Sequence, residues 1–193
     1  MAEDKVNPGF KIVLVGGSAG SLEVLIKILP RLESLNGFAL IIILHRKTAE
    51  DSTLEELIAI KTHVPVKEVE DKTKLEPGNI YIAPSDYHLL FEKDGRLSLD
   101  ISERVNYSRP SIDVSFESAA DAFGKAVIGI LLSGANADGT IGLQAIKKEG
   151  GMVIIQDPKT AEIPFMPQNA ILYNSPDFVL SPDGITSLLA SIN

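Results

Sequence analysis

The sequence predicts an α/β fold: a single doubly wound domain with a mainly parallel sheet, helices on both faces and an added β-hairpin. Three observations lead to this prediction. Short apolar runs typical of buried strands alternate with segments whose apolar residues recur at helical spacing. The chain has 193 residues, 45% of them hydrophobic, which is enough for one core. No repeat, low-complexity tract or long linker interrupts the alternation, and strand–helix–strand crossovers build parallel sheets.

The first part of the chain contains two strands, each followed by a helix. A buried strand is predicted over 11–15, and apolar residues follow at helical spacing over 22–32. The second strand covers 39–45. The second helix begins near Ser52, because Ser52 and Glu55 have the spacing of a capping box.

The middle of the chain contains four shorter strands, two of which form the hairpin. These strands are predicted over 65–69, 79–83, 88–92 and 96–100. Lys93, Asp94 and Gly95 separate the last two strands and have the composition of a tight turn.

The remaining part returns to alternating helices and strands. The predicted elements are a helix over 111–123, a strand over 126–132, a helix over 140–149, and strands over 152–156 and 178–180. Gly150 and Gly151 end the helix that precedes them, and Ser181 and Pro182 open a final helix. We divide the chain into a polar N-terminal extension, residues 1–10, and one domain, residues 11–193.

Composition excludes several classes of function. Without cysteine, the chain has no disulfide, thiolate metal site or cysteine nucleophile. A net charge of −8 argues against nucleic acid, which binds to basic surfaces. The longest apolar run, residues 38–44, is far shorter than the ~18 residues that span a bilayer, and residues 1–9 lack the core of a signal peptide. We therefore expect a cytoplasmic protein that is not integral to a membrane, with no metal and no cofactor.

A small-residue turn, GGSAGS over residues 16–21, directly follows the first predicted strand. Ligands bind at the carboxyl ends of strands in such sheets. The P-loop and dinucleotide patterns both fail on spacing, whereas G-x-S-x-G in a strand–turn–helix setting fits a nucleophile elbow at Ser18. The amides of Ala19 and Gly20 would then face developing negative charge at a helix start. A turn needed only for close strand–helix packing is the alternative.

A serine nucleophile needs a base, and the chain has three histidines. His45 ends the second strand, on the same sheet edge as Ser18. His88, at a loop-to-strand junction, is a second candidate, and His63 fits a solvated loop. Asp138, at the end of another strand, would orient His45, although it also fits a polar turn in which it caps the next helix. The order Ser18, His45, Asp138 differs from that of common α/β-hydrolases, which indicates a different scaffold.

Five segments carry a resemblance to a known family. GGSAGS is similar to its GASTGG nucleophile loop. The other four segments are NIYIAPSDYHL, SRPSIDVSFESAA, LLSGANADGTIGLQAI and IIQDPKTAEIPFMPQNAI. Together they resemble, in family order and along nearly the full chain, the catalytic domain of the chemotaxis receptor methylesterases, the CheB family.

The resemblance implies a role for each matching residue. Ser18 is the nucleophile, His45 the base and Asp138 the residue that orients it, with the backbone amides of Ala19 and Ala135 as the oxyanion hole. The implied reaction is hydrolysis of glutamate γ-methyl esters on methyl-accepting chemotaxis receptors, with glutamine deamidation as a related activity.

The chain departs from the family pattern at several positions. Ala19 replaces a threonine, Ser21 a glycine, and Ala135-Asn136 a Met-Gly pair. Arg46 and Arg109 are candidates for substrate binding, although the segment around Arg109 also fits an N-capped helix start at Ser111.

The family's receiver domain has no counterpart here, so we expect an unregulated enzyme, a receiver acting in trans, or an excised domain. The alternatives to an active methylesterase are a catalytically inactive signalling or binding module that keeps the fold, and a serine esterase for small acyl esters.

Overall fold

The main sheet has seven strands. The fold comes from a computed structural model, which describes residues 6–46 and 51–192, with only the backbone described for 51–53. The strands are β1 (Lys11–Gly17), β2 (Phe38–Leu44), β3 (Val66–Glu68), β5 (Ile80–Ile82), β8 (Val127–Leu131), β9 (Met152–Gln156) and β10 (Phe178–Leu180). They lie in the order β10-β9-β8-β1-β2-β5-β3, and every neighbouring pair is parallel.

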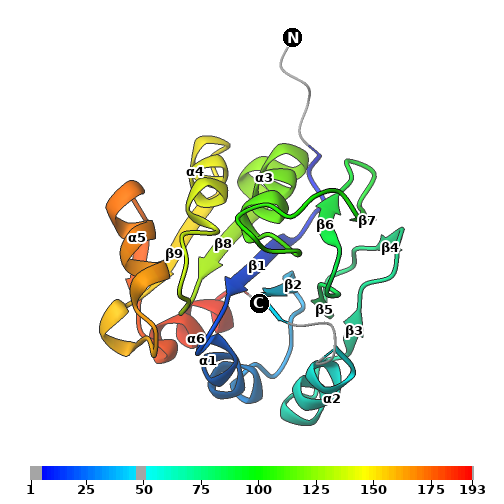
Figure 1. The fold of residues 1–193 in the computed structure, drawn as a ribbon. Coiled ribbons are helices and arrows are strands. Elements are labelled where there is room, and N and C mark those ends of the chain that lie inside the picture. The colour runs from blue at the N-terminus through cyan, green and yellow to red at the C-terminus, as the bar shows by residue number, and fades with distance from the viewer. Residues whose placement is uncertain (1–5, 47–50, 193) are drawn as a thin grey trace.

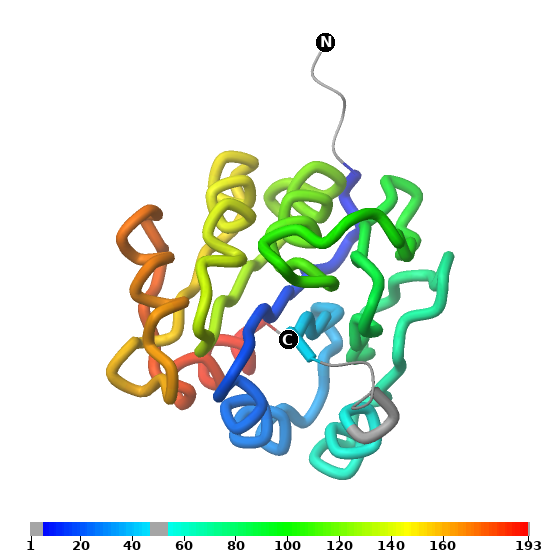
Figure 2. The backbone as a smooth tube through the Cα atoms, viewed as in Figure 1, coloured from blue at the N-terminus to red at the C-terminus, as the bar shows by residue number. Residues whose placement is uncertain are grey.

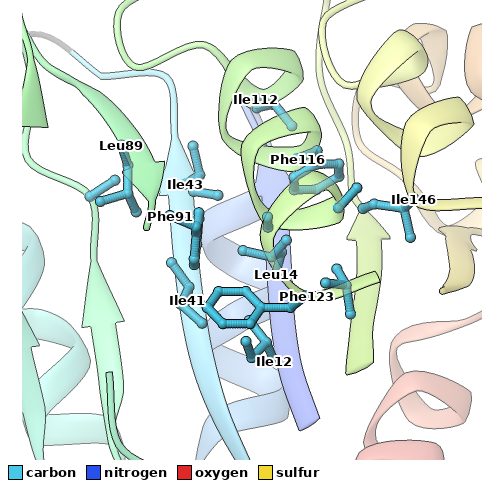
Figure 3. Packing of buried hydrophobic residues seen from close by; sticks show 14 of the residues in the cluster. Ile12, Leu14, Ile41, Ile43, Leu89, Phe91, Ile112, Phe116, Phe123 and Ile146 are labelled. Carbon is cyan, nitrogen blue, oxygen red and sulfur yellow. The ribbon is translucent and has the colours of Figure 1, made fainter. Parts of the chain in front are cut away.

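Helices cover both faces of this sheet (Figure 1). They are α1 (Ser21–Ile28), α2 (Asp51–Lys61), α3 (Ile112–Phe123), α4 (Thr140–Lys148), α5 (Phe165–Tyr173) and α6 (Pro182–Ala190), with 3-10 turns at Leu29–Arg31, Gly124–Ala126 and Pro158–Thr160. Side chains alternate along each strand, so Ile12 and Leu14 pack with α3, α4 and α5 (Figure 3), while Val13 and Val15 pack with α1, α2 and α6. The predicted doubly wound architecture is confirmed.

The hairpin belongs to a second, smaller sheet. Strands β4 (Thr73–Lys74), β6 (His88–Phe91) and β7 (Arg96–Asp100) pair antiparallel in the order β4-β7-β6. The turn forms as predicted, with Gly95 at a φ of +84°. Instead of extending the edge of the main sheet, this unit packs on α3, where the Phe91 amide donates to Ser118 Oγ at 2.8 Å and the Phe91 and Phe123 rings meet edge to face.

Most predicted elements occur within one or two residues of their expected bounds. Gly150, at a φ of +82°, ends α4, and the Ser181 side chain caps α6 by accepting from the Gly184 amide. Strand β4 and helix α5 were not predicted. The helix expected near Ser52 is α2, but the proposed Ser52 cap lies outside the described side chains.

The N-terminal segment enters the domain before β1 begins. The Val6 amide donates to the Ala122 carbonyl at 3.1 Å, and Val6 and Phe10 pack against the core. The described part of the 1–10 extension therefore lies on the domain, and the division at residue 11 stays a prediction.

The topology brings the loops after β1 and β8 together. From β1, the chain moves to β2 on one side and later returns through α3 to β8 on the other side (Figure 2). Doubly wound sheets bind ligands at such a reversal of strand order. Residues after β1, β2 and β8 are therefore positioned to form one site.

Candidate active site

Ser18 is the first residue after β1, and its backbone is held from two sides. Its amide donates to the Ser133 carbonyl at 2.9 Å, and its own carbonyl accepts from the amide and the hydroxyl of Ser21. Gly20 has a φ of +81°, and a Cβ there would lie 2.6 Å from Glu162 Cβ, so only glycine fits. The turn fixes the Ser18 backbone and leaves its side chain half-exposed.

His45 directly follows β2 and stands beside this turn. Its amide donates to the Gly17 carbonyl at 3.1 Å, which continues the pairing of β1 with β2. Ser18 and His45 line one cavity of about 290 Å³. The other lining residues are Arg46, Leu22, Leu44, Leu54 and Leu57. The cavity therefore has a polar end at Ser18 and His45 and largely apolar walls.

His45 is hydrogen-bonded to Asp138. Its Nε2 lies 2.7 Å from Asp138 Oδ2, and the Asp138 carboxylate is fully buried. An ionised carboxylate only accepts hydrogen bonds, so Nε2 carries the ring proton. The lone pair of the neutral imidazole is then on Nδ1, the nitrogen that remains to take a proton from Ser18.

Asp138 is held as an anion by five donors. The five hydrogen bonds come from His45 Nε2, Asn106 Nδ2, Ser111 Oγ and the backbone amides of Ile112 and Asp113. Burial disfavours the charge, but the hydrogen bonds outweigh it and lower the pKa of Asp138 to about 2. The two amides belong to the first turn of α3, where helix polarity also favours an anion.

The alternative role for Asp138, a cap on the following helix, is wrong. Gly139, with a φ of +92°, is the N-cap of α4, and no side chain caps that helix. Asp138 instead bonds to the start of α3, whose own N-cap is Ser111, as predicted. Asp138 does bond to the first turn of a helix, but to the helix that begins at Ile112, 26 residues before it in the sequence.

His88, the second candidate base, is fully buried and occupied at both ring nitrogens. Its Nδ1 accepts from the Ser111 amide at 3.2 Å, so Nε2 donates to the Glu103 carbonyl at 2.9 Å. A base needs a free lone pair, so the geometry assigns His88 a structural role. His63 is exposed.

The loops that hold Ala19 and Ala135 are joined by Ser133. The Ser133 hydroxyl donates to the Ala19 carbonyl at 2.7 Å and accepts from the Ile163 amide at 2.9 Å. Both alanines are exposed, and no described residue accepts a hydrogen bond from either alanine amide. Their N–H groups are therefore open to a ligand beside Ser18.

The two arginines expected to bind substrate already have protein partners. Arg46 lines the cavity and donates to Glu68 Oε2 at 3.1 Å and to the Ala83 carbonyl at 2.9 Å. Arg109 Nη1 donates to the carbonyls of Ile101 and Ser102, both at 2.8 Å. Arg46 is thus at the cavity with its charge balanced, and Arg109 holds a surface loop.

The sequence did not point to Asn106 or Asp113. Asn106 Nδ2 donates to both Asp113 Oδ2 and Asp138 Oδ1, and Asp113 is itself buried. The available signal was the Asp in the SRPSIDVSFESAA segment, which is the second residue of α3. Nothing in the sequence pairs it with Asp138.

The described residues contain neither a cluster of metal-binding side chains nor a membrane-spanning helix. Among residues 6–46 and 51–192, no three His, Cys, Asp or Glu side chains cluster to hold a metal. Within the same ranges, no helix is long and apolar enough to cross a bilayer.

A serine, a histidine and a buried aspartate at the ends of adjacent parallel strands define the class of serine hydrolases. Residues 13–189 match the model of the CheB methylesterase family. The chain belongs to this family.

Relatives agree in sequence and in structure. A Leptospira interrogans protein is 41% identical over 184 residues that cover 95% of both chains. A Carboxydothermus hydrogenoformans protein, named protein-glutamate methylesterase/protein-glutamine glutaminase 1, is 34% identical, and the match covers 95% of this chain and 55% of that one. The crystal structure of the Thermotoga maritima CheB methylesterase catalytic domain superposes with a TM-score of 0.89 at 31% identity, covering 95% of this chain and 99% of the other.

Proposed function

We propose that this protein is a protein-glutamate methylesterase that hydrolyses glutamate γ-methyl esters on chemoreceptors, with glutamine deamidation as a related activity. The observation that carries the proposal is the His45 Nε2 to Asp138 Oδ2 contact of 2.7 Å, next to Ser18 in one cavity. The substrate class rests on the names of the relatives. A cytoplasmic location and a receiver domain acting in trans belong to the same proposal.

The first half of the reaction forms an acyl-enzyme. Ser18 Oγ attacks the ester carbonyl carbon while His45 Nδ1 takes the hydroxyl proton. Asp138 keeps its charge and stabilises the imidazolium. The oxyanion is stabilised by the amides of Ala19 and Ala135, each worth ~3–4 kcal/mol in the transition state. Collapse breaks the bond to the methoxy group, which leaves as methanol with the His45 proton.

The second half releases the glutamate carboxylate. Water attacks the acyl carbon of the Ser18 ester as His45 Nδ1 takes a proton. His45 then donates that proton to Ser18 Oγ as the second tetrahedral intermediate collapses and the bond between the acyl carbon and Oγ breaks. Deamidation follows the same course, with ammonia as the leaving group. Both steps need a neutral His45 with its lone pair on Nδ1, which the contact with Asp138 supports.

The departures from the family pattern are compatible with this chemistry. Ala19 and Ala135 contribute backbone amides, which a change of side chain leaves in place. Ser21 is buried, and its hydroxyl reinforces the turn by donating to the Ser18 carbonyl. Asn136 keeps its loop ordered by accepting from the Asp138 amide at 3.1 Å.

A small-ester esterase is the second candidate, because four leucines line the cavity beside Ser18. An acyl or alkyl group of a small ester would bury apolar surface there. Arg46 would face a peptide substrate at the same opening, but its pairing with Glu68 makes it a weak anchor for an anion.

Methanol release from methylated receptor membranes tests the proposal. We expect the wild type to release methanol, Ser18→Ala to lose at least about 10³-fold in rate, and Ser187→Ala, on an exposed serine of α6, to match the wild type. Folded wild type that releases none would overturn the methylesterase proposal. A serine-reactive phosphonate then separates the alternatives: turnover of p-nitrophenyl esters with Ser18 labelled supports the small-ester esterase, and no labelling of Ser18 supports a binding module.

A further inference from the structure

Two buried carboxylates lie side by side behind His45. Asp113 is 4% exposed and Asp138 is fully buried, and the Asp113 amide donates to Asp138 Oδ1 at 3.1 Å. Burial, and then the charge of Asp138, raise the pKa of Asp113 to about 6, against the opposing hydrogen bond from the Gly142 amide. Two such carboxyl groups tend to share one proton, which would weaken the charge that orients His45.

Asn106 bridges the two carboxylates. Its Nδ2 donates to Asp113 Oδ2 at 2.8 Å and to Asp138 Oδ1 at 2.9 Å, so each amide hydrogen has a carboxylate partner. Only the NH₂ end of an asparagine side chain donates, which fixes its orientation. A single neutral side chain therefore supplies one hydrogen bond to each carboxyl group.

The loop that carries Asn106 is built to present it. Val105 and Ser108 exchange backbone hydrogen bonds of 3.2 and 2.9 Å, and the two residues between them, Asn106 and Tyr107, have φ values of +52° and +61°. This is a tight two-residue turn with both central residues in the left-handed region, which asparagine tolerates well. Arg109 holds the base of the loop by donating to two of its carbonyls.

We propose that Asn106 is a positioning residue, which acts on catalysis through Asp138. The inference rests on the proposed Ser-His-Asp mechanism. By donating to Asp138 Oδ1 and to Asp113, Asn106 keeps the two carboxylates from sharing a proton. The Asp138 carboxylate then stays ionised, with its Oδ2 directed at His45 Nε2. Asn106 does not line the cavity at Ser18 and His45, so we expect it to affect kcat and not substrate binding.

Replacing Asn106 by glycine removes the amide without straining the turn, because glycine adopts a positive φ freely. We expect Asn106→Gly to lower kcat about 10-fold or more, the value of a hydrogen bond to a charged group, with KM unchanged. Tyr107→Gly is the matched control, since Tyr107 occupies the same turn at a similar φ and its side chain is 96% exposed. We expect this control to keep the kcat of the wild type on a p-nitrophenyl ester.

A second readout does not depend on activity. The His45 Nε2 proton, bonded to a carboxylate, should give a ¹H NMR resonance downfield of the backbone amides. We expect it to move upfield or broaden in Asn106→Gly and to stay in place in Tyr107→Gly.

Two results would overturn the inference: a kcat and resonance in Asn106→Gly equal to those of the control, or loss of cooperative unfolding in Asn106→Gly alone, which would make Asn106 structural. If the wild type releases no methanol, the proposed function fails, while the resonance still tests Asn106.

Discussion

Asp138→Asn is the substitution that most clearly separates charge from shape at this site. In the wild type, Oδ1 of Asp138 accepts three hydrogen bonds and Oδ2 accepts two, one of them from His45. An asparagine has nearly the same shape but only one acceptor oxygen. Its NH₂ group must therefore face donors on one side or the other.

The count of donors decides which way the new amide turns. An NH₂ in the place of Oδ1 would oppose three donors, whereas an NH₂ in the place of Oδ2 would oppose two. Each conflict costs about 1–3 kcal/mol, so the amide turns its NH₂ toward His45. His45 Nε2 must then accept, which moves the ring proton to Nδ1. That nitrogen no longer takes the proton of Ser18.

The expected loss follows from this exchange of tautomer. In serine hydrolases, replacing the triad aspartate by asparagine puts the histidine in the wrong tautomer and lowers kcat on the order of 10⁴-fold. The assay is methanol release together with the rate of phosphonate labelling of Ser18. Asp177→Asn is the matched control, because Asp177 also accepts from a backbone amide, that of Val153 at 2.8 Å, but does not contact His45. If Asp138→Asn, folded and measured beside this control, keeps a tenth or more of wild-type kcat, the tautomer argument is wrong.

Three further predictions test the surroundings of the site. Gly134→Ala places a Cβ 2.5 Å from Met166 Cε and 3.0 Å from Ser18 Cβ, so kcat should fall and urea unfolding should show a loss of about 1–3 kcal/mol; an unchanged kcat would show that the site absorbs the methyl group. The folded state holds the Asp113 proton up to about pH 6, whereas the unfolded chain loses it near the ordinary 3.8, so stability should fall as pH rises through this window. If the urea midpoints of the wild type and of Asp113→Asn fall equally as pH rises through this window, the raised pKa of Asp113 does not contribute to stability and the prediction is wrong. Ser111→Ala should cost about 1–3 kcal/mol of unfolding free energy, because the Ser111 hydroxyl both caps α3 and donates to Asp138 Oδ1, and calorimetry that finds no change would refute both contributions.

The sequence predicted the features that depend on local pattern. Apolar runs locate the strands, and the glycines around Ser18 locate the turn that follows β1. Because parallel strands end at one edge of the sheet, the placement of Ser18, His45 and Asp138 near one another followed from strand ends alone. The structure brings His45 and Asp138 into contact and places Ser18 and His45 around one cavity.

Features that depend on distant contacts escaped prediction. Helix α5 has no amphipathic stripe, since Phe165, Leu172 and Tyr173 are exposed while Met166 is buried, so periodicity does not reveal it. Asn106 lies in a turn with positive φ, 32 residues before its partner Asp138. Its role follows only from the folded position of the loop.

Trapping the acyl-enzyme tests the central claim most directly. Wild-type protein would be mixed with a peptide containing a glutamate γ-methyl ester, quenched in acid within milliseconds to seconds, digested and examined by mass spectrometry. The proposed mechanism predicts a glutamyl-peptide adduct on the fragment that contains Ser18, formed with release of methanol and absent from Ser18→Ala. Methanol release without an adduct on Ser18, or an adduct on another residue, would contradict it.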